Sequence, residues 1–363
     1  GRGDLSAVTV LLESGVNPDT PSSGRTAIVA ASMGGHLDVV KALLAAGADT
    51  ETGATTATGS NTALIWALVN GHTAVARALV EAGANLRVAR EYGSPALVYA
   101  AAGNDPDSLA IVQGMIAAGL DLQPGLLAAV HSGSVEIVKV LLAAGARADF
   151  RLAKGFTPLP APRLLRLLRD GVPLPRGESI PPGGDTLLML AAARGRADVM
   201  RALLAAGADA NAKRNDGGTA LMAAVANIRA EAVQVLLTAK ADVNAVDNNG
   251  STALMLAVPD SQMASPLNIP SSEIARMLQE AESKVQGIRY APVTLRSTRG
   301  GLASDRILYP AATDIVRMLL GAGADPAIRR SDDRTAAMLA REANLADMSK
   351  LLDPAVAALP AAN

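Results

Sequence analysis

Residues 24–49 read "GRTAIVAASMGGHLDVVKALLAAGAD", and this stretch decides the fold because the chain spells variants of it again. The same pattern returns at residues 60–85, 184–209 and 217–242. Each copy has a threonine at its third position, and these are Thr26, Thr62, Thr186 and Thr219. The string "LLAAGA" is found at residues 43–48, 141–146 and 203–208. Self-similarity of this kind indicates a repeat architecture.

Each copy of the pattern predicts two short helices joined by a turn. Thr26 precedes a run of small and apolar residues, as an N-cap does when its hydroxyl accepts from the first free amides of a helix. Gly35 then ends that helix through a left-handed conformation. In the second helix Val40, Leu43 and Leu44 recur at helical spacing, and Gly47 ends it. The Asp and Asn residues that follow favour an exposed hairpin leading to the next threonine.

The repeated units resemble ankyrin repeats. The Thr-Ala-Leu opening stands where that family has Thr-Pro-Leu-His, and the family's Gly-His is kept at residues 35–36 and 71–72. The 33 residues between Gly207 and Lys240 match the family's period of about 33. The resemblance implies an all-α ankyrin-repeat solenoid of stacked helix-turn-helix units with short hairpin fingers. First helices and hairpins would line its concave side.

The domain organisation expected is one solenoid over residues 1–363, with about ten units when incomplete ones are counted. A partial unit at residues 1–20 holds only a second helix and its turn, so its first helix is missing. A degenerate unit is expected at 154–182, where prolines interrupt the first helix. An inserted segment covers about 259–313, and a C-terminal capping unit with exposed charges covers 332–363.

Two departures from the period have structural consequences. The hairpin between Gly119 and Pro124 is five residues long, so the finger there should be nearly absent. The inserted segment is predicted to hold a degenerate extra unit and a long loop over about 285–312. Residues 283–304 carry basic residues without an acid and are interpreted as a solvated loop rather than a basic patch; the basic residues are Lys284, Arg289, Arg296 and Arg299.

Composition excludes several classes of function. With 50% hydrophobic and 18% charged residues the chain can bury a core, and its net charge of -1 gives no global field to attract nucleic acid or an anionic membrane. The longest stretch without Lys, Arg, Asp or Glu, residues 52–76, is rich in Thr, Gly and Asn and predicts no membrane span. The absence of Cys excludes disulfides and thiolate chemistry, and favours an exported, periplasmic protein over a cytoplasmic one. The opening "GRGDLS" leaves a removed signal peptide open.

The motifs that could carry chemistry have structural interpretations. The resemblance implies that His36 and His72 bridge neighbouring layers, while His131 is alone and forms no metal site. No phosphate-binding loop and no Ser-His-acid constellation is present, so no catalytic residue, cofactor or metal is predicted. The "RGD" at residues 2–4 falls at the entrance to a second helix, and Trp66 is expected to be buried.

The function implied by the resemblance is non-catalytic protein binding through the groove and the fingers. Tyr and Arg are the strongest candidates for contact. The candidate finger residues are Arg87, Arg90, Tyr92, Arg214, Asn215, Asp247 and Asn248. The candidate groove residues are Asn70, His131, Arg194 and Asn227. The candidates in the insertion are Arg289, Arg296 and Arg299.

Alternatives to a free-standing scaffold remain open. The solenoid could be a regulatory or docking domain of a larger polypeptide, or the loop 285–312 could itself hold a recognition or ligand site. An unidentified protein is the expected partner, no nucleic acid is expected, and a monomer is favoured. The bias toward Ala, Arg and Gly suggests a GC-rich bacterial source.

Overall fold

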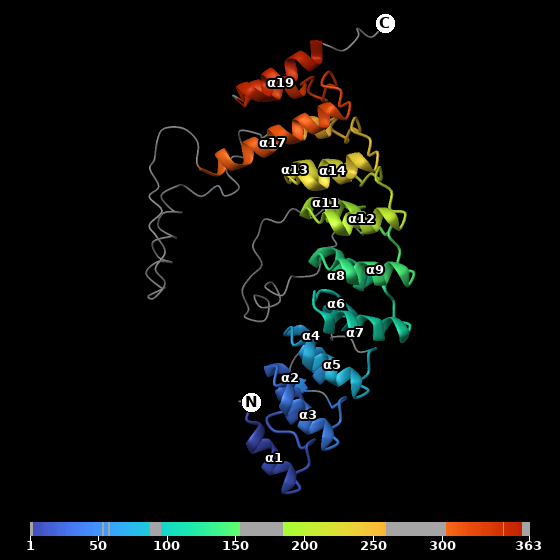
Figure 1. The fold of residues 1–363 in the computed structure, drawn as a ribbon, viewed down its shortest axis with the longest axis vertical. Helices are drawn as coiled ribbons and strands as arrows, with labels where there is room; N and C mark the ends of the chain where they lie inside the picture. The colour runs from blue at the N-terminus through green and yellow to red at the C-terminus, as the bar shows by residue number, and fades with distance from the viewer. Residues whose placement is uncertain are drawn as a thin grey trace.

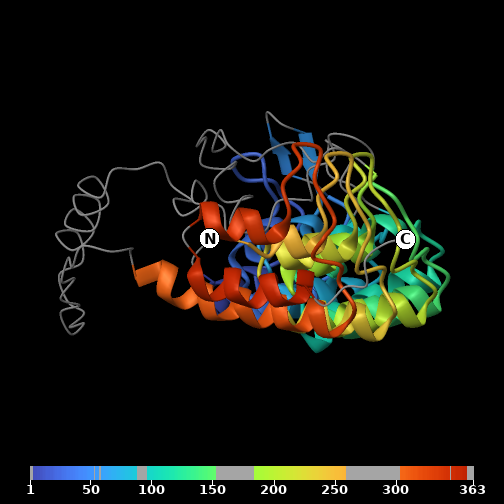
Figure 2. The same cartoon turned by 90° about the horizontal axis from the view of Figure 1, so that it is seen from above.

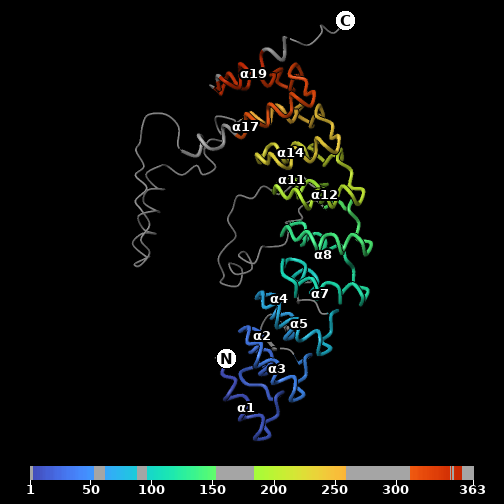
Figure 3. The backbone as a smooth tube through the Cα atoms, in the orientation of Figure 1, coloured from blue at the N-terminus to red at the C-terminus, as the bar shows by residue number. Residues whose placement is uncertain are grey.

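The computed structural model describes residues 3–52, 54–56, 59–87, 96–152, 184–258, 303–343 and 345–357 (Figure 1). In this part the chain forms an elongated stack of helix pairs, and its two ends lie at opposite ends of the stack (Figure 3). No helix described is long and apolar enough to cross a membrane. The predicted all-α solenoid is confirmed.

The helices form two rows, and each helix contacts the next one in its row. The second helices of the units are α1 (Leu5–Glu13), α3 (Leu37–Ala45), α5 (Thr73–Glu81), α7 (Pro106–Ala117), α9 (Val135–Ala143), α12 (Ala197–Ala205), α14 (Ala230–Thr238), α17 (Ala303–Gly321) and α19 (Ala346–Ala357). The first helices are α2 (Ala27–Gly34), α4 (Ala63–Val69), α6 (Ala96–Ala101), α8 (Gln123–Ser132), α11 (Leu187–Arg194), α13 (Ala220–Ala226), α15 (Ala253–Leu256) and α18 (Ala336–Glu342). The second helices follow an arc with the first helices inside it (Figure 1).

Threonine caps open most of the first helices. The Thr186 and Thr219 hydroxyls accept hydrogen bonds from the backbone N–H groups of Met189 and Met222, at 3.2 and 3.3 Å. Three further caps of this kind are made by Thr62, Thr252 and Thr335. Thr26 is the N-cap residue of α2 and has the same extended backbone, but its side chain makes no cap hydrogen bond. The hydroxyl bond predicted for it is therefore not made.

A buried alanine lies at the same repeat position in each described first helix or, for α15, at its C-cap. These residues are at most 4% exposed, and they are Ala31, Ala67, Ala100, Ala129, Ala191, Ala224, Ala257 and Ala340. A methyl side chain lets the second helix of the unit and the neighbouring first helices approach closely, because no larger group has to fit between them. The core around them is aliphatic, as the composition predicts.

The layers on either side of residues 153–183 are direct neighbours. Leu152 donates a backbone hydrogen bond to Asp185 (2.8 Å) and accepts one from Gly184 (3.0 Å). Helix α8 contacts α11, and α9 contacts α12, which leaves no space for a further layer between the two pairs. The residues of the predicted degenerate unit 154–182 lie outside those described.

Helix α17 begins inside the segment that was expected to be inserted. That segment was placed at about 259–313, with a loop at 285–312, but α17 begins at Ala303. Helix α17 contacts both α14 and α15, so it is the second helix of the α15 unit. The loop expected at 285–312 extends too far along the chain. The repeat period fixes where the second helix ends, at Gly321, but it does not indicate where an extended helix begins. The predicted degenerate extra unit lies outside the described residues.

The hairpins that the structure describes project from one side of the stack, and the second helices lie on the other side (Figure 2). One hairpin contains two antiparallel strands, β1 (Ala54–Thr56) and β2 (Gly59–Asn61), with Thr55 opposite Ser60. Between α7 and α8 the finger is nearly absent, as predicted, because α7 ends at Ala117 and α8 begins at Gln123.

Charged side chains stand at both ends of the described stack. The Asp4 carboxylate of the "RGD" motif caps α1 by accepting from the Ala7 N–H at 3.0 Å, so Asp4 has a structural role. In the last described helix pair Arg341, Glu342 and Lys350 are exposed to solvent, and the capping role proposed for residues 332–363 stays a prediction.

Candidate functional site

The concave side of the stack carries a stripe of partly exposed side chains from the first helices, which we call the groove. Its residues lie one place before, or two and three places after, the buried alanine of each helix. The second helices cover the opposite face, so these positions are the ones left open. The groove residues include Met33, Trp66, Asn70, Tyr99, Ala102, His131, Leu190, Arg194, Ala226 and Asn227.

The N-terminal part of the groove is aromatic. Trp66 and Tyr99 each precede the buried alanine of their helix, and α4 contacts α6, so the two side chains occupy equivalent places in consecutive layers. Trp66 was expected to be buried, but it is half-buried because its position faces the open side of α4. Tyr99 was missed, although its register relative to Trp66 could have identified it. The Asn70 amide donates to the Met33 carbonyl of the preceding layer at 3.3 Å.

The C-terminal part of the groove carries Arg194, and two further arginines stand on the turns between the first and second helices. His131 and Arg194 lie near the ends of α8 and α11. Arg196 covers the turn of the preceding layer, since its Nε lies 2.8 Å from the place that a Cβ on Gly133 would occupy. Arg229 covers the next turn in the same way, and its Nε donates to the Ala193 carbonyl at 3.4 Å.

Arg196 and Arg229 occupy the repeat position of His36 and His72, immediately before the second helix. The bridging predicted for this position is confirmed at His72, whose Nε2 lies 3.2 Å from the Met33 carbonyl oxygen of the preceding layer. Sequence reasoning missed both arginines. Their register five places after the buried alanine was the signal that could have found them.

The pKa of the His131 imidazole is lowered, in part by positive charges nearby. Burial first, and then the charges of Arg194 and Arg196, lower its pKa from 6.5 to about 4. Both effects disfavour the protonated ring. His131 is therefore neutral near pH 7, and the positive charge of the groove comes from the arginines.

Finger residues proposed from the sequence hold the fingers together. Arg214 donates to Asp216 at 2.6 Å and also lies 3.7 Å from Asp185. The Asn248 amide donates to the Asn215 carbonyl of the neighbouring finger at 3.2 Å. The Asp247 carboxylate accepts from two backbone N–H groups of its own loop, both at 2.8 Å. Among these residues Asn215 and Asn248 are the exposed ones.

The other contact residues proposed from the sequence do not lie together with these finger residues. Arg87 donates to the carbonyl of Ala118, where α7 ends, and so links two layers. Asn227 is exposed and its amide donates to the Ala223 carbonyl of its own helix at 2.8 Å. Five candidates lie outside the described residues, and these are Arg90, Tyr92, Arg289, Arg296 and Arg299.

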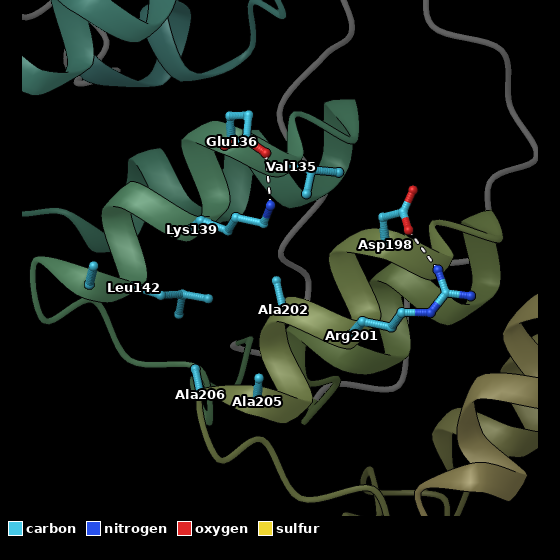
Figure 4. A pocket seen from close by; sticks show the side chains of 10 residues that line it. Val135, Glu136, Lys139, Leu142, Asp198, Arg201, Ala202, Ala205 and Ala206 are labelled. Carbon is cyan, nitrogen blue, oxygen red and sulfur yellow. Dashed lines mark hydrogen bonds and ion pairs between the residues drawn. The ribbon is translucent and has the colours of Figure 1, made fainter.

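An open depression of about 810 Å³ lies on the opposite, convex face between α9 and α12 (Figure 4). Apolar side chains such as Leu142 and Ala202 line it, and charged residues stand around them. These charges are matched in pairs, Glu136 with Lys139 at 2.8 Å and Asp198 with Arg201 at 2.6 Å. Within the described ranges, no three His, Asp or Glu side chains gather as metal ligands would.

Family models match three segments of the chain. A model of ankyrin repeats in many copies matches residues 2–44, a single ankyrin repeat matches 60–90, and a model of three ankyrin repeats matches 181–285. The chain is an ankyrin repeat protein. Ankyrin repeats are generally protein–protein interaction modules, and theirs is generally a non-catalytic fold. No curated protein matches the chain.

Proposed function

We propose that this ankyrin repeat protein is a non-catalytic scaffold that binds a partner protein through the groove and the exposed finger residues. The observation that carries the proposal is the register of the groove. Partly exposed side chains return at fixed places in consecutive first helices, so they form one continuous surface rather than scattered positions.

The stack favours binding because it holds these side chains in place before a partner arrives. The backbone of each layer is fixed by contacts such as the Asn70 bond to Met33, so little further ordering is required on association. Trp66 and Tyr99 are the groove side chains best suited to anchor a partner, since large aromatic residues dominate the binding energy of protein interfaces.

Site-specific photo-crosslinking tests this function. A benzophenone amino acid is placed in the groove at Ala102 or Ala226, and on the convex face at Ala205 as the matched control. We expect one cellular protein to crosslink from a groove position and not from Ala205, with competition by unlabelled scaffold. A partner that crosslinks from Ala205 alone, or that is lost only when residues 285–302 are deleted, contradicts the proposal.

A further inference from the structure

We infer that the N-terminal part of the groove binds a proline-rich segment of the partner polypeptide in the extended polyproline II conformation. The binding group is the aromatic pair, defined as Trp66 of α4 and Tyr99 of α6. This inference rests on the proposed scaffold function and names the chemistry of the partner at one place in the groove.

The two rings of the aromatic pair stand at the same repeat position in adjacent layers. Each residue immediately precedes the buried alanine of its helix, Ala67 or Ala100, and α4 contacts α6. Both aromatic side chains are partly exposed. Packed helices lie about 8–10 Å apart, so a partner that runs along the groove meets the two rings at that interval.

A polyproline II chain has the repeat that this spacing requires. It has three residues per turn and rises about 3.1 Å per residue, so every third side chain returns to the same face after about 9 Å. A proline and a second proline three residues later would therefore each lie against one ring of the aromatic pair. A β-strand returns to the same face after about 6.6 Å and falls out of step with the layers. Aromatic-lined surfaces recognise proline-rich segments, whose backbone loses little conformational entropy because it is already extended.

The packing of the stack does not require aromatic rings at this position. In the flanking layers, α2 and α8, the same position holds Ala30 and Ala128. The stack therefore closes with a single methyl group there, and the two rings supply apolar surface beyond what the packing needs. Within the described part of the chain the Tyr99 hydroxyl makes no hydrogen bond, so no described group competes for it with a carbonyl of the partner. Such carbonyls are open to outside donors because polyproline II has no internal hydrogen bonds.

The groove positions around the aromatic pair carry no charge. In the described helices α2, α4 and α6 they hold apolar or aromatic residues, glycine and Asn70, whose amide donates to the Met33 carbonyl at 3.3 Å. An uncharged, proline-rich segment covers this surface without burying an unpaired charge. A single-stranded nucleic acid also stacks on aromatic rings, but it needs cations along its backbone, and these positions supply none.

Titration followed by the fluorescence of Trp66 tests the inference. Trp66 is the single tryptophan of the chain, so its emission reports on this site. The probe is a synthetic peptide with proline at every third position and alanine between, and the control peptide has the same number of prolines at every fourth position. We expect the first peptide to shift the emission to shorter wavelength and to bind about tenfold more tightly than the control, because only its prolines match the layers. Equal binding of the two peptides, or an emission that does not change, overturns the inference.

A variant of Tyr99 tests the second ring. Tyr99→Leu should lower the affinity for the first peptide about tenfold, because aromatic side chains supply much of the energy of such contacts. The stack tolerates leucine at this position, since α11 has Leu190 there. Leu190→Ala, at the same repeat position outside the aromatic pair, is the control and should change the affinity little. Equal losses in the two variants contradict the assignment of the site.

Competition separates a failure of this inference from a failure of the scaffold function. The first peptide should displace the partner that crosslinks from Ala102. If a partner crosslinks there and the peptide does not compete, the inference fails while the scaffold function stands. If no partner crosslinks from the groove, the scaffold function itself fails. The chain also contains Pro158, Pro160 and Pro162. If their replacement by serine changes the emission of Trp66 without added peptide, the chain's own segment fills the site and a partner's segment does not.

Discussion

The side chain of Asn244 accepts a hydrogen bond at 2.7 Å from the backbone N–H of Asp325, which lies 81 residues further along the chain. Its amide group also donates to the Gly323 carbonyl at 3.2 Å. The same bond recurs one layer earlier, where Asn211 accepts from the N–H of Asp242 at 2.7 Å. The ladder of hydrogen bonds between hairpins thus continues past the insertion, and α17 takes the place of an ordinary second helix.

Asn244→Ala should destabilise the C-terminal layers. The substitution removes two hydrogen bonds between layers and should lower the free energy of unfolding by about 1–2 kcal/mol. Because stability in a solenoid comes from contacts between adjacent layers, amide exchange should rise first in α17–α19. Asn227→Ala is the control, since that amide bonds only within its own helix. Equal losses for the two variants, by urea denaturation, would contradict the ladder.

Lys240→Gly should stabilise the protein. Lys240 has a φ of 58° at the place where the equivalent residue of the previous layer is Gly207, with a φ of 87°. A left-handed conformation is unfavourable for residues with a Cβ, so a glycine here relieves strain in the folded state. A glycine also has more conformational entropy in the unfolded chain, which opposes folding. The first effect should exceed the second by about 0.5 kcal/mol or more.

Gly207→Ala is the reciprocal test. No atom lies within 4 Å of the place of its Cβ, so the loss of about 1 kcal/mol expected there comes from the backbone alone. Thermal melts of both variants check the pair, and a stabilised Gly207→Ala variant would show that the conformation is not the cause.

Ala224→Leu should be strongly destabilising. Ala224 is fully buried between its own second helix and the adjacent first helices, so the larger side chain forces the layers apart at about 1–3 kcal/mol. Ala226→Leu, at an exposed position of the same helix, should change stability by less than about 0.5 kcal/mol. Chemical denaturation distinguishes them, and comparable effects would argue against close packing at the buried position.

Stability should rise with pH between about 4 and 6.5 because of His131. The folded protein lowers the pKa of this ring from 6.5 to about 4, so in this range the unfolded chain binds the proton more readily. The stabilising effect should be complete above pH 6.5 and lost as pH falls toward 4. His131→Gln should flatten this part of the profile. Arg196→Gln should raise the pKa of His131 because it removes a like charge, and an unchanged pKa would contradict their proximity.

The sequence by itself determined the helix pairs, their turns and the family. Stacked repeats contact only their neighbours, so a motif such as residues 24–49 carries nearly all the information that its own layer needs. The threonine caps, the short finger after Gly119 and the bridging role of His72 were all predictable for this reason.

Only the tertiary structure decided which layers are adjacent where the period breaks. The contact of α8 with α11 places Arg196 over Gly133 although residues 153–183 separate them in the chain. An inserted segment has no period, so the sequence could not show that the stack closes across it or that α17 begins at Ala303. The approach of Arg196 to the turn at Gly133 depends on this adjacency, because the two residues meet across a layer boundary and not along one helix.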